Sequence, residues 1–310
     1  MCCRKKLAIS LIWTVLVLGS LEKNGHAQVH FAPSGTDTPQ FEHTVPTKGS
    51  VLWWQGDAPA TSFVMDSTAT VEVIVQLAAP PLLAQRSGKA SLANQQATFR
   101  SALAAAVPSA VHRRSFEAAF NGLALTVPRE ATTTLATLPY VAKVHPDLLV
   151  THGGWTEDST PTAYDNDTNR IIGADQVHLL HQLTGTGVTI AIIDSGVDYR
   201  HPDLGGGFGP SYRVIGGYDF VNDDADPMDD DGHGTHVAGI AAGNGPFLMG
   251  VAPNANLLAY KVLDAEGFGQ QSGILAGIER ALDPDQDPKT DDAADVINLS
   301  LGGLGPIPFK

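Results

Sequence analysis

The sequence predicts an α/β protein in which a small ferredoxin-like α+β domain precedes a parallel sheet. Strand and helix patterns alternate over residues 170–310, as is typical of a parallel sheet covered by helices. Residues 70–150 follow a split βαβ order, which indicates a ferredoxin-like module. The run 188–193 is apolar without alternation and leads into Asp194, which is the pattern of a strand buried on both faces.

The first 27 residues are predicted to be a secretory signal peptide. The basic residues 4–6 precede an apolar stretch from Leu7 to Leu18, and Gly25-His26-Ala27 offers small residues at a cleavage site. As a helix, this stretch is too short for the roughly 30 Å hydrocarbon core of a bilayer. We therefore expect a secreted, extracellular or cell-envelope protein that has no membrane contact once the signal is removed, and Cys2 and Cys3 would leave with the signal.

Residues 28–69 are predicted to be an extended leader, because Pro, Gly, Ser and Thr are frequent and no hydrophobic period is sustained. Residues 70–150 follow as the α+β domain, with strands at 71–77, 120–127 and 140–145, helices at 90–107 and 129–138, and room for a strand near 111–120. Residues 151–169 form a polar linker. In residues 170–310 we expect strands at 188–193, 257–263 and 294–299, and helices at 174–182, 234–243 and 270–282.

Charge narrows the range of partners. The 310 residues carry a net charge of −14, and the acidic excess lies beyond residue 150. A nucleic-acid partner needs a basic face, so nucleic-acid binding is not expected. Acidic runs are compatible with bound cations and equally with a solvated acidic surface.

Asp194 and His233 are the candidate catalytic pair. Asp194 is the first polar residue after a buried strand, and ligand sites of open α/β sheets gather at that end. His233 stands between two glycines at the predicted start of a helix, where a neutral imidazole can accept a hydroxyl proton that a carboxylate helps it to hold. A strand-end aspartate that only caps a turn is the alternative for Asp194. A zinc site of His233 and His236 is disfavoured, because no third ligand follows at a zinc spacing.

Several segments together resemble the subtilisin-like serine proteases, the peptidase S8 family. They are Val188–Asp198, Asp231–Gly239, His201-Pro202-Asp203-Leu204, Gly250-Val251-Ala252-Pro253 and Asp295–Gly303, and the segments 205–209 and 214–220 look most like bacterial cell-envelope and minor extracellular proteases. The resemblance covers residues 70 to about 304. It implies a serine endopeptidase whose catalytic domain, from residue 170, follows an inhibitory propeptide at 70–150 and a processing site in or near 151–169.

The resemblance also implies a peptide-binding cleft. The residues that match its walls are Gly267, Phe268, Gly269, Ser300, Leu301 and Gly302. Such walls hold an extended polypeptide substrate by β-strand addition, which tolerates many sequences. The intramolecular partner implied is the propeptide, and ordinary glycine-containing loops are the alternative.

No cofactor is required for this chemistry, although Ca²⁺ is possible. Asp203 matches a calcium-ligating position of some relatives, and the acidic runs Asp223–Asp231 and Asp283–Asp287 add carboxylates. Neither run has the pattern of an EF-hand.

The nucleophile segment of the family, Gly-Thr-Ser-Met-Ala, does not occur in the sequence, and neither Ser195 nor Ser300 lies in a comparable setting. The chain as written is therefore expected to be inactive and prone to aggregate. Two alternatives stay open: a non-catalytic propeptide-type inhibitor or folding chaperone, and a calcium-binding module.

Overall fold

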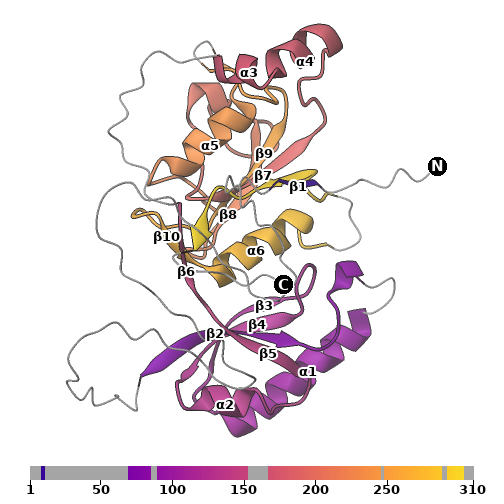
Figure 1. Cartoon of the computed structure of the whole chain (residues 1–310), viewed down its shortest axis with the longest axis vertical. Coiled ribbons are helices and arrows are strands. Elements are labelled where there is room, and N and C mark those ends of the chain that lie inside the picture. Colours follow the sequence, from indigo (N-terminus) through magenta and orange to yellow (C-terminus); the bar gives the residue numbers. More distant parts are fainter. Residues whose placement is uncertain are drawn as a thin grey trace, which may run out of the picture. The chain divides into compact units, whose positions relative to one another are not determined.

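A parallel sheet and an antiparallel sheet organise the part of the chain that this computed structural model describes, namely residues 8–10, 69–84, 89–152, 167–245, 248–287 and 292–303 (Figure 1). All of these residues belong to one compact unit. No helix among them is long and apolar enough to cross a membrane.

The antiparallel sheet is built from the first described segment. Its elements are β2 (Thr70–Leu77), α1 (Lys89–Ala106), β3 (Val111–Phe116), β4 (Gly122–Pro128), α2 (Ala131–Leu135) and β5 (Val141–Pro146), with the 3₁₀ turn η1 (Leu82–Ala84) after β2. The strand order is β3-β4-β2-β5, and every pairing is antiparallel. The expected strands and helices of this segment are all present, and α2 is shorter than expected.

The two faces of the antiparallel sheet are both covered. Phe99 of α1 and Leu135 of α2 pack with Val75 and Leu123 of the sheet in one buried cluster. On the other face, Ile74 belongs to a second cluster that includes side chains of the parallel-sheet region. The alternation of side chains along a strand therefore directs one set to the helices and the other to the rest of the molecule.

The parallel sheet has the strand order β1-β11-β7-β9-β8. The strands are β1 (Ala8–Ser10), β7 (Thr189–Asp194), β8 (Val214–Asp219), β9 (Asn256–Lys261) and β11 (Val296–Asn298), and every pairing among them is parallel. The helices of this region are α3 (Asp167–Ile171), α4 (Ala174–His181), α5 (His233–Ala242) and α6 (Gln271–Leu282), with the 3₁₀ turn η2 (Pro202–Leu204). The three expected strands and three expected helices agree with β7, β9, β11, α4, α5 and α6 to within about two residues at most ends.

Helices α5 and α6 cover different faces of the parallel sheet. Ala238 of α5 packs with Ile192 of β7 in one cluster, whereas Ala276 of α6 packs with Ile193, the next residue of the same strand, in another. Successive residues of β7 are thus buried on both sides, which explains why the sequence of this strand shows no alternation.

Strand β8 is not among the strands that the sequence predicts. Its Gly216-Gly217 pair weakens the strand signal, since glycine is disfavoured in strand interiors. The structure gives the reason for Gly217: a Cβ atom there would lie 2.1 Å from the carbonyl oxygen of Ala259 on β9.

A short third sheet joins distant parts of the sequence. Strand β6 (Leu149–Thr151) lies between β10 (Phe268–Gln270) and β12 (Gly302–Gly303) and pairs antiparallel with both. Its pairing with β10 is visible where the two labels adjoin in Figure 1.

Three expected segments fall largely outside the described residues. Of the predicted signal peptide only β1 is described, and Ile9 on it pairs in register with Ile297 of β11. The leader 28–68 and residues 153–166 of the linker lie outside the described residues.

Candidate active site

Asp194 and His233 are brought together by the ends of two elements. Asp194 is the last residue of β7 and is fully buried, and His233 is the first residue of α5. Nδ1 of His233 lies 2.7 Å from Oδ1 of Asp194. The same oxygen accepts a hydrogen bond from the backbone N–H of Ser195, at 2.8 Å.

Gly234 permits this approach of the helix to the strand. A Cβ atom at Gly234 would lie 2.1 Å from the carbonyl oxygen of Gly196, in the turn that follows β7. Any larger residue would push the start of α5 away from Asp194. The glycine after His233 is therefore required by packing.

The surroundings of His233 favour its charged form. Burial of the imidazole opposes protonation, but the hydrogen bond and charge of Asp194, together with the charges of Asp231 and Asp229, outweigh burial and raise the pKa of His233 above its ordinary value. Asp194 therefore stabilises the imidazolium that would form if His233 accepted a proton.

The carboxylate of Asp229 connects the start of α5 to the end of β7 by hydrogen bonds. Its Oδ1 accepts hydrogen bonds from the hydroxyl of Ser195 at 2.9 Å and from the N–H of Gly232 at 2.9 Å, and its Oδ2 accepts from the N–H of Thr235 at 2.9 Å. Burial alone would raise the pKa of Asp229, yet these donors hold it below its ordinary value. The Ser195 hydroxyl in turn accepts from the N–H of Gly234, at 2.8 Å. Ser195 is thus engaged in structure.

A buried lysine supports the same strand ends. Lys261, the last residue of β9, is 1% exposed and pairs across the sheet with Asp194. Its ammonium donates to the carbonyl oxygens of Ser195 and Leu263, both at 2.9 Å, and forms an ion pair with Asp230. This charge fixes the backbone beside Asp194.

The predicted cleft residues line β6. Phe268 and Gly269 on β10 pair with Thr151 and Val150, and Gly302 on β12 also pairs with Thr151. The remaining predicted wall residues are placed differently: Leu301 packs against the cluster that contains Val150, Gly267 precedes β10, and the hydroxyl of Ser300 accepts from Asn298 at 2.9 Å.

His152 is a residue of this site that sequence analysis missed. Its ring stacks on that of His233, with centroids 4.7 Å apart and an interplanar angle of 16°. Its Nε2 lies 3.3 Å from Oδ2 of Asp231. Because His152 follows a strand in a polar linker, nothing in its sequence context distinguishes it from a solvent-exposed histidine.

The residues considered for metal binding are dispersed. Carboxylates of the run Asp223–Asp231 accept hydrogen bonds from protein groups, for example Asp226 from the hydroxyl of Tyr199 at 2.7 Å. Among the described residues, only Asp283, Asp285 and Asp292 converge as a possible metal-binding group, and His233 and His236 do not. Asp203 is buried and its Oδ1 has no hydrogen-bond partner, which suits a cation ligand, but it belongs to no such group. Calcium at Asp203 stays a prediction.

Comparison with known proteins gives a family model that spans Asp194 and His233, and several similar serine proteases. Residues 185–306 match the family model described as the subtilase family. The chain is 34% identical over 258 residues to minor extracellular protease Vpr of Bacillus subtilis strain 168, a match that covers 77% of this chain and 30% of Vpr. It is 50% identical over 120 residues to the thermophilic serine proteinase of Bacillus sp. strain AK1, covering 38% of this chain and 26% of that protein. It is 39% identical over 188 residues to subtilisin E of B. subtilis strain 168, covering 59% of this chain and 42% of subtilisin E. The chain thus spans less than half the length of each of these relatives.

Proposed function

We propose that this chain, which belongs to the subtilase family by its residues 185–306, contributes the acid–base half of a secreted serine endopeptidase. The contact of 2.7 Å between Asp194 and His233 carries the proposal. With Nδ1 of His233 held by the carboxylate, Nε2 is the nitrogen that would take a hydroxyl proton and later return it to the leaving amine.

The substrates would be polypeptides in extended conformation. Strands β10 and β12 hold β6 from both sides, and strand addition of this kind uses backbone groups that every peptide has. The side chain of Val150, 1% exposed, fills an apolar site in the cluster that includes Leu301. A substrate strand would occupy the place of β6.

Residues 70–150 would be a ferredoxin-like inhibitory propeptide. The order of elements, strand-helix-strand-strand-helix-strand, and the sheet order β3-β4-β2-β5 support this proposal. The segment ends in β6, so the same domain that packs on α6 would also fill the proposed cleft. A processing site would lie beyond His152, in the linker 151–169.

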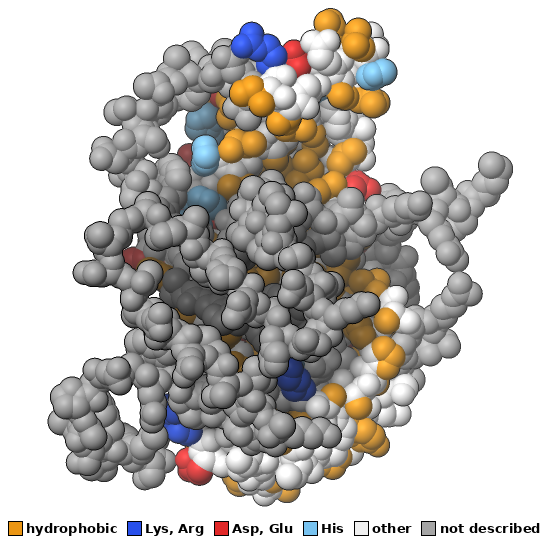
Figure 2. All heavy atoms as spheres, in the orientation of Figure 1, with side chains coloured by type: hydrophobic (Ala, Val, Ile, Leu, Met, Phe, Trp, Pro, Cys, Tyr) orange, Lys and Arg blue, Asp and Glu red, His pale blue; other side chains and the backbone are white. Residues whose placement is uncertain are grey.

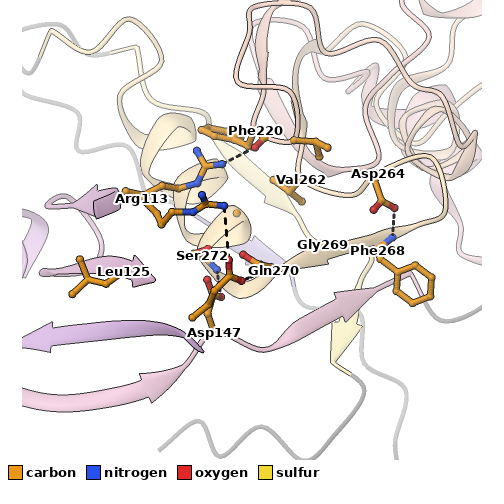
Figure 3. A pocket seen from close by; sticks show the side chains of 14 residues that line it. Arg113, Leu125, Asp147, Phe220, Val262, Asp264, Phe268, Gly269, Gln270 and Ser272 are labelled. Atoms are coloured by element: carbon orange, nitrogen blue, oxygen red, sulfur yellow. Dashed lines mark hydrogen bonds and ion pairs between the residues drawn. The ribbon is translucent and has the colours of Figure 1, made fainter. Parts of the chain in front are cut away.

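Polar contacts support the docking of this domain. The carboxylate of Glu279 on α6 accepts hydrogen bonds at 2.6–3.1 Å from the successive N–H groups of residues 117–120. Asp147 accepts from the N–H of Ser272 at 2.9 Å, and Arg114 donates to the carbonyl oxygen of Phe220 at 2.6 Å. Figure 3 shows Asp147, Ser272 and Phe220 around a pocket between the antiparallel sheet and β10.

A second candidate is a non-catalytic inhibitor or folding chaperone, which the position of β6 between β10 and β12 supports. Sub-micromolar inhibition of an intact relative by the chain would support it. A calcium-binding module is a third candidate, which a chelator-dependent melting temperature would support. Secretion rests on the signal-like residues 1–27 and on the relative named as extracellular.

The test is to supply a nucleophile segment to residues 1–303. The family's downstream segment, taken from subtilisin E and carrying the Gly-Thr-Ser-Met-Ala run, is joined after Gly303, and casein hydrolysis is measured. We expect hydrolysis that a sulfonyl fluoride blocks and that His233→Ala lowers by about 10⁶, the loss known for the relative subtilisin itself. The chain without this segment should show no turnover.

The matched control is His181→Ala, at an exposed histidine on α4, which should leave hydrolysis unchanged. Equal hydrolysis by the His233→Ala chimera, or efficient casein cleavage by the unextended chain, would contradict the proposal.

A further inference from the structure

The pocket that holds the His152 side chain is closed on several sides. The ring of His233 covers one face of the imidazole, and Asp231 reaches its Nε2. Gly267, with a φ of +75°, forms another wall, and a Cβ atom there would lie 1.9 Å from Nε2 of His152. The side chain of His152 is 6% exposed and that of Asp231 is 12% exposed. The pocket is therefore shaped to an imidazole and shielded from water.

Asp231 is held in place independently of His152. Its Oδ1 accepts a hydrogen bond from the backbone N–H of His233, at 3.0 Å, which leaves Oδ2 directed at the His152 ring. A carboxylate fixed at the start of α5 thus links the candidate catalytic histidine to the pocket.

The chemistry of the pocket discriminates between side chains. A largely buried carboxylate oxygen needs a donor, and the loss of that donor is costly because the charge remains desolvated. A site built to hydrogen-bond a side chain also rejects analogues of similar size that cannot donate. Leucine at position 152 would fill the volume and leave Oδ2 of Asp231 without this partner.

We propose that Asp231 is a specificity-determining residue that selects histidine at the substrate position now occupied by His152. This inference rests on the proposed function, in that substrates would replace β6 in the cleft. Val150 and His152 lie two residues apart, so their side chains are on the same face of the strand. The cleft would then recognise Val150 by its apolar surface and His152 by its N–H donor.

The experiment measures hydrogen–deuterium exchange of the backbone amides of residues 149–151 in the full chain at pH 7. These amides lie on the strand held between β10 and β12, so their exchange reports how often the strand leaves the cleft. We compare the wild-type chain with His152→Leu, His152→Gln, Asp231→Asn and the double variant His152→Leu with Asp231→Asn.

We expect His152→Leu to exchange roughly tenfold faster than the wild type, because a hydrogen bond to a charged group is lost. His152→Gln keeps a donor and should exchange at an intermediate rate. In the Asp231→Asn background, where the acceptor for the N–H of His233 is retained, the effect of His152→Leu should shrink to about twofold or less.

Two controls match the substitutions. His145→Leu removes a histidine on β5 that contacts Gln76. Asp223→Asn removes the charge of a carboxylate that accepts a hydrogen bond from the hydroxyl of Tyr218. Neither substitution should change the hydrogen–deuterium exchange rate of the backbone amides of residues 149–151.

The outcomes separate this inference from the proposed function. Equal exchange in the wild type and His152→Leu, or an equal effect of His152→Leu with and without Asp231, overturns the selectivity and leaves the cleft intact. Unprotected amides at 149–151 in the wild-type chain overturn the cleft assignment itself. Casein hydrolysis by the extended chain tests the Asp194–His233 pair independently of the selectivity of Asp231 and of the cleft assignment.

Discussion

The two large sheets bury different kinds of side chain. In the antiparallel-sheet region, the buried polar side chains among the described residues 69–146 are the amides of Gln96 and Asn121. The parallel-sheet region buries charged or titratable groups, namely Asp194, Asp203, Asp219, His233 and Lys261. Buried charge is costly unless it is paired and hydrogen-bonded. The first sheet thus packs on an apolar core, whereas the second region holds ionisable groups in place at strand ends and in an adjoining turn and helix.

Both regions expose apolar side chains, but the parallel-sheet region gathers them on two neighbouring helices. In the parallel-sheet region, Ile171, Leu179, Leu180 and Leu183 are each more than 60% exposed on and around α3 and α4. Figure 2 shows hydrophobic side chains gathered over these helices at the top of the view. Exposed apolar patches of this kind favour association with other surfaces.

The largest effect is expected from a substitution that disrupts the apolar core beside the antiparallel sheet. Phe99 on α1 is fully buried in its cluster, so Phe99→Ala should lower the free energy of unfolding by about 3–5 kcal/mol. Urea unfolding followed by circular dichroism measures this loss. Leu83→Ala, at a side chain that is 65% exposed, is the control and should change little. A loss no larger than that of the control would show that this cluster is not a core.

Next in size is the loss of the carboxylate that organises the parallel-sheet site. Asp229→Ala removes the acceptor for Ser195, Gly232 and Thr235 and should cost roughly 2–3 kcal/mol of unfolding free energy. The control Asp224→Ala removes an exposed side chain that accepts from the N–H of Asp226. Equal stability of the two variants would mean that the Asp229 network contributes nothing.

The effect of Asp229→Ala has a defined pH dependence. Its donors hold the pKa of Asp229 below the value of about 3.9 expected in the unfolded chain. The stabilisation is therefore present above that value and is lost as pH falls through the pKa of the folded state. Wild type and variant should converge in stability in strong acid, and a constant difference would refute this account.

A smaller effect is expected where the two regions meet. Glu279→Ala removes the acceptor for the N–H groups of residues 117–120, whose hydrogen exchange should become about tenfold faster. Glu266→Ala, at an exposed acid, is the matched control. Unchanged exchange at residues 117–120 would show that Glu279 does not hold the antiparallel-sheet region.

The smallest change leaves the fold intact and tests the electrostatics of the site. In Asp194→Asn the pKa of His233 should fall, because burial, which lowers it, is no longer outweighed by the carboxylate. An NMR titration of the His233 ring measures this, with Asp198→Asn as the control. Since the pKa of His233 is raised on folding, the pair stabilises the chain fully below the unfolded value of about 6.5 and loses that stabilisation as pH rises through the folded value. An unshifted titration in Asp194→Asn would contradict the pairing.

The sequence predicts the elements that have a strong period and the site residues that lie in local motifs. Strand β7 and helix α5 are evident because an apolar run and a small-residue helix adjoin Asp194 and His233. Neither motif gives the distance between these residues, which depends on the contact of Gly234 with Gly196.

What the sequence does not predict depends on tertiary contacts. Lys261 lies at the end of an expected strand, but its burial follows from carbonyl oxygens contributed by Ser195 and Leu263. His152 comes from a linker and enters the site because β6 pairs with strands more than a hundred residues away. Pairings over such separations leave no periodic signal in the sequence.

The register of β6 has a consequence for the polypeptide that would, under the proposed function, take its place. Side chains alternate along a strand, so a shift by a single residue would move Val150 out of its apolar site and place Thr151 there instead. Under the proposed function, a substrate strand would bind in place of β6, and the fit of its side chain at the Val150 position would set its register. That register would then decide which peptide bond lies beside His233. Inserting or deleting one residue before Val150 would leave this spacing unchanged, whereas doing so after it would move the presented bond.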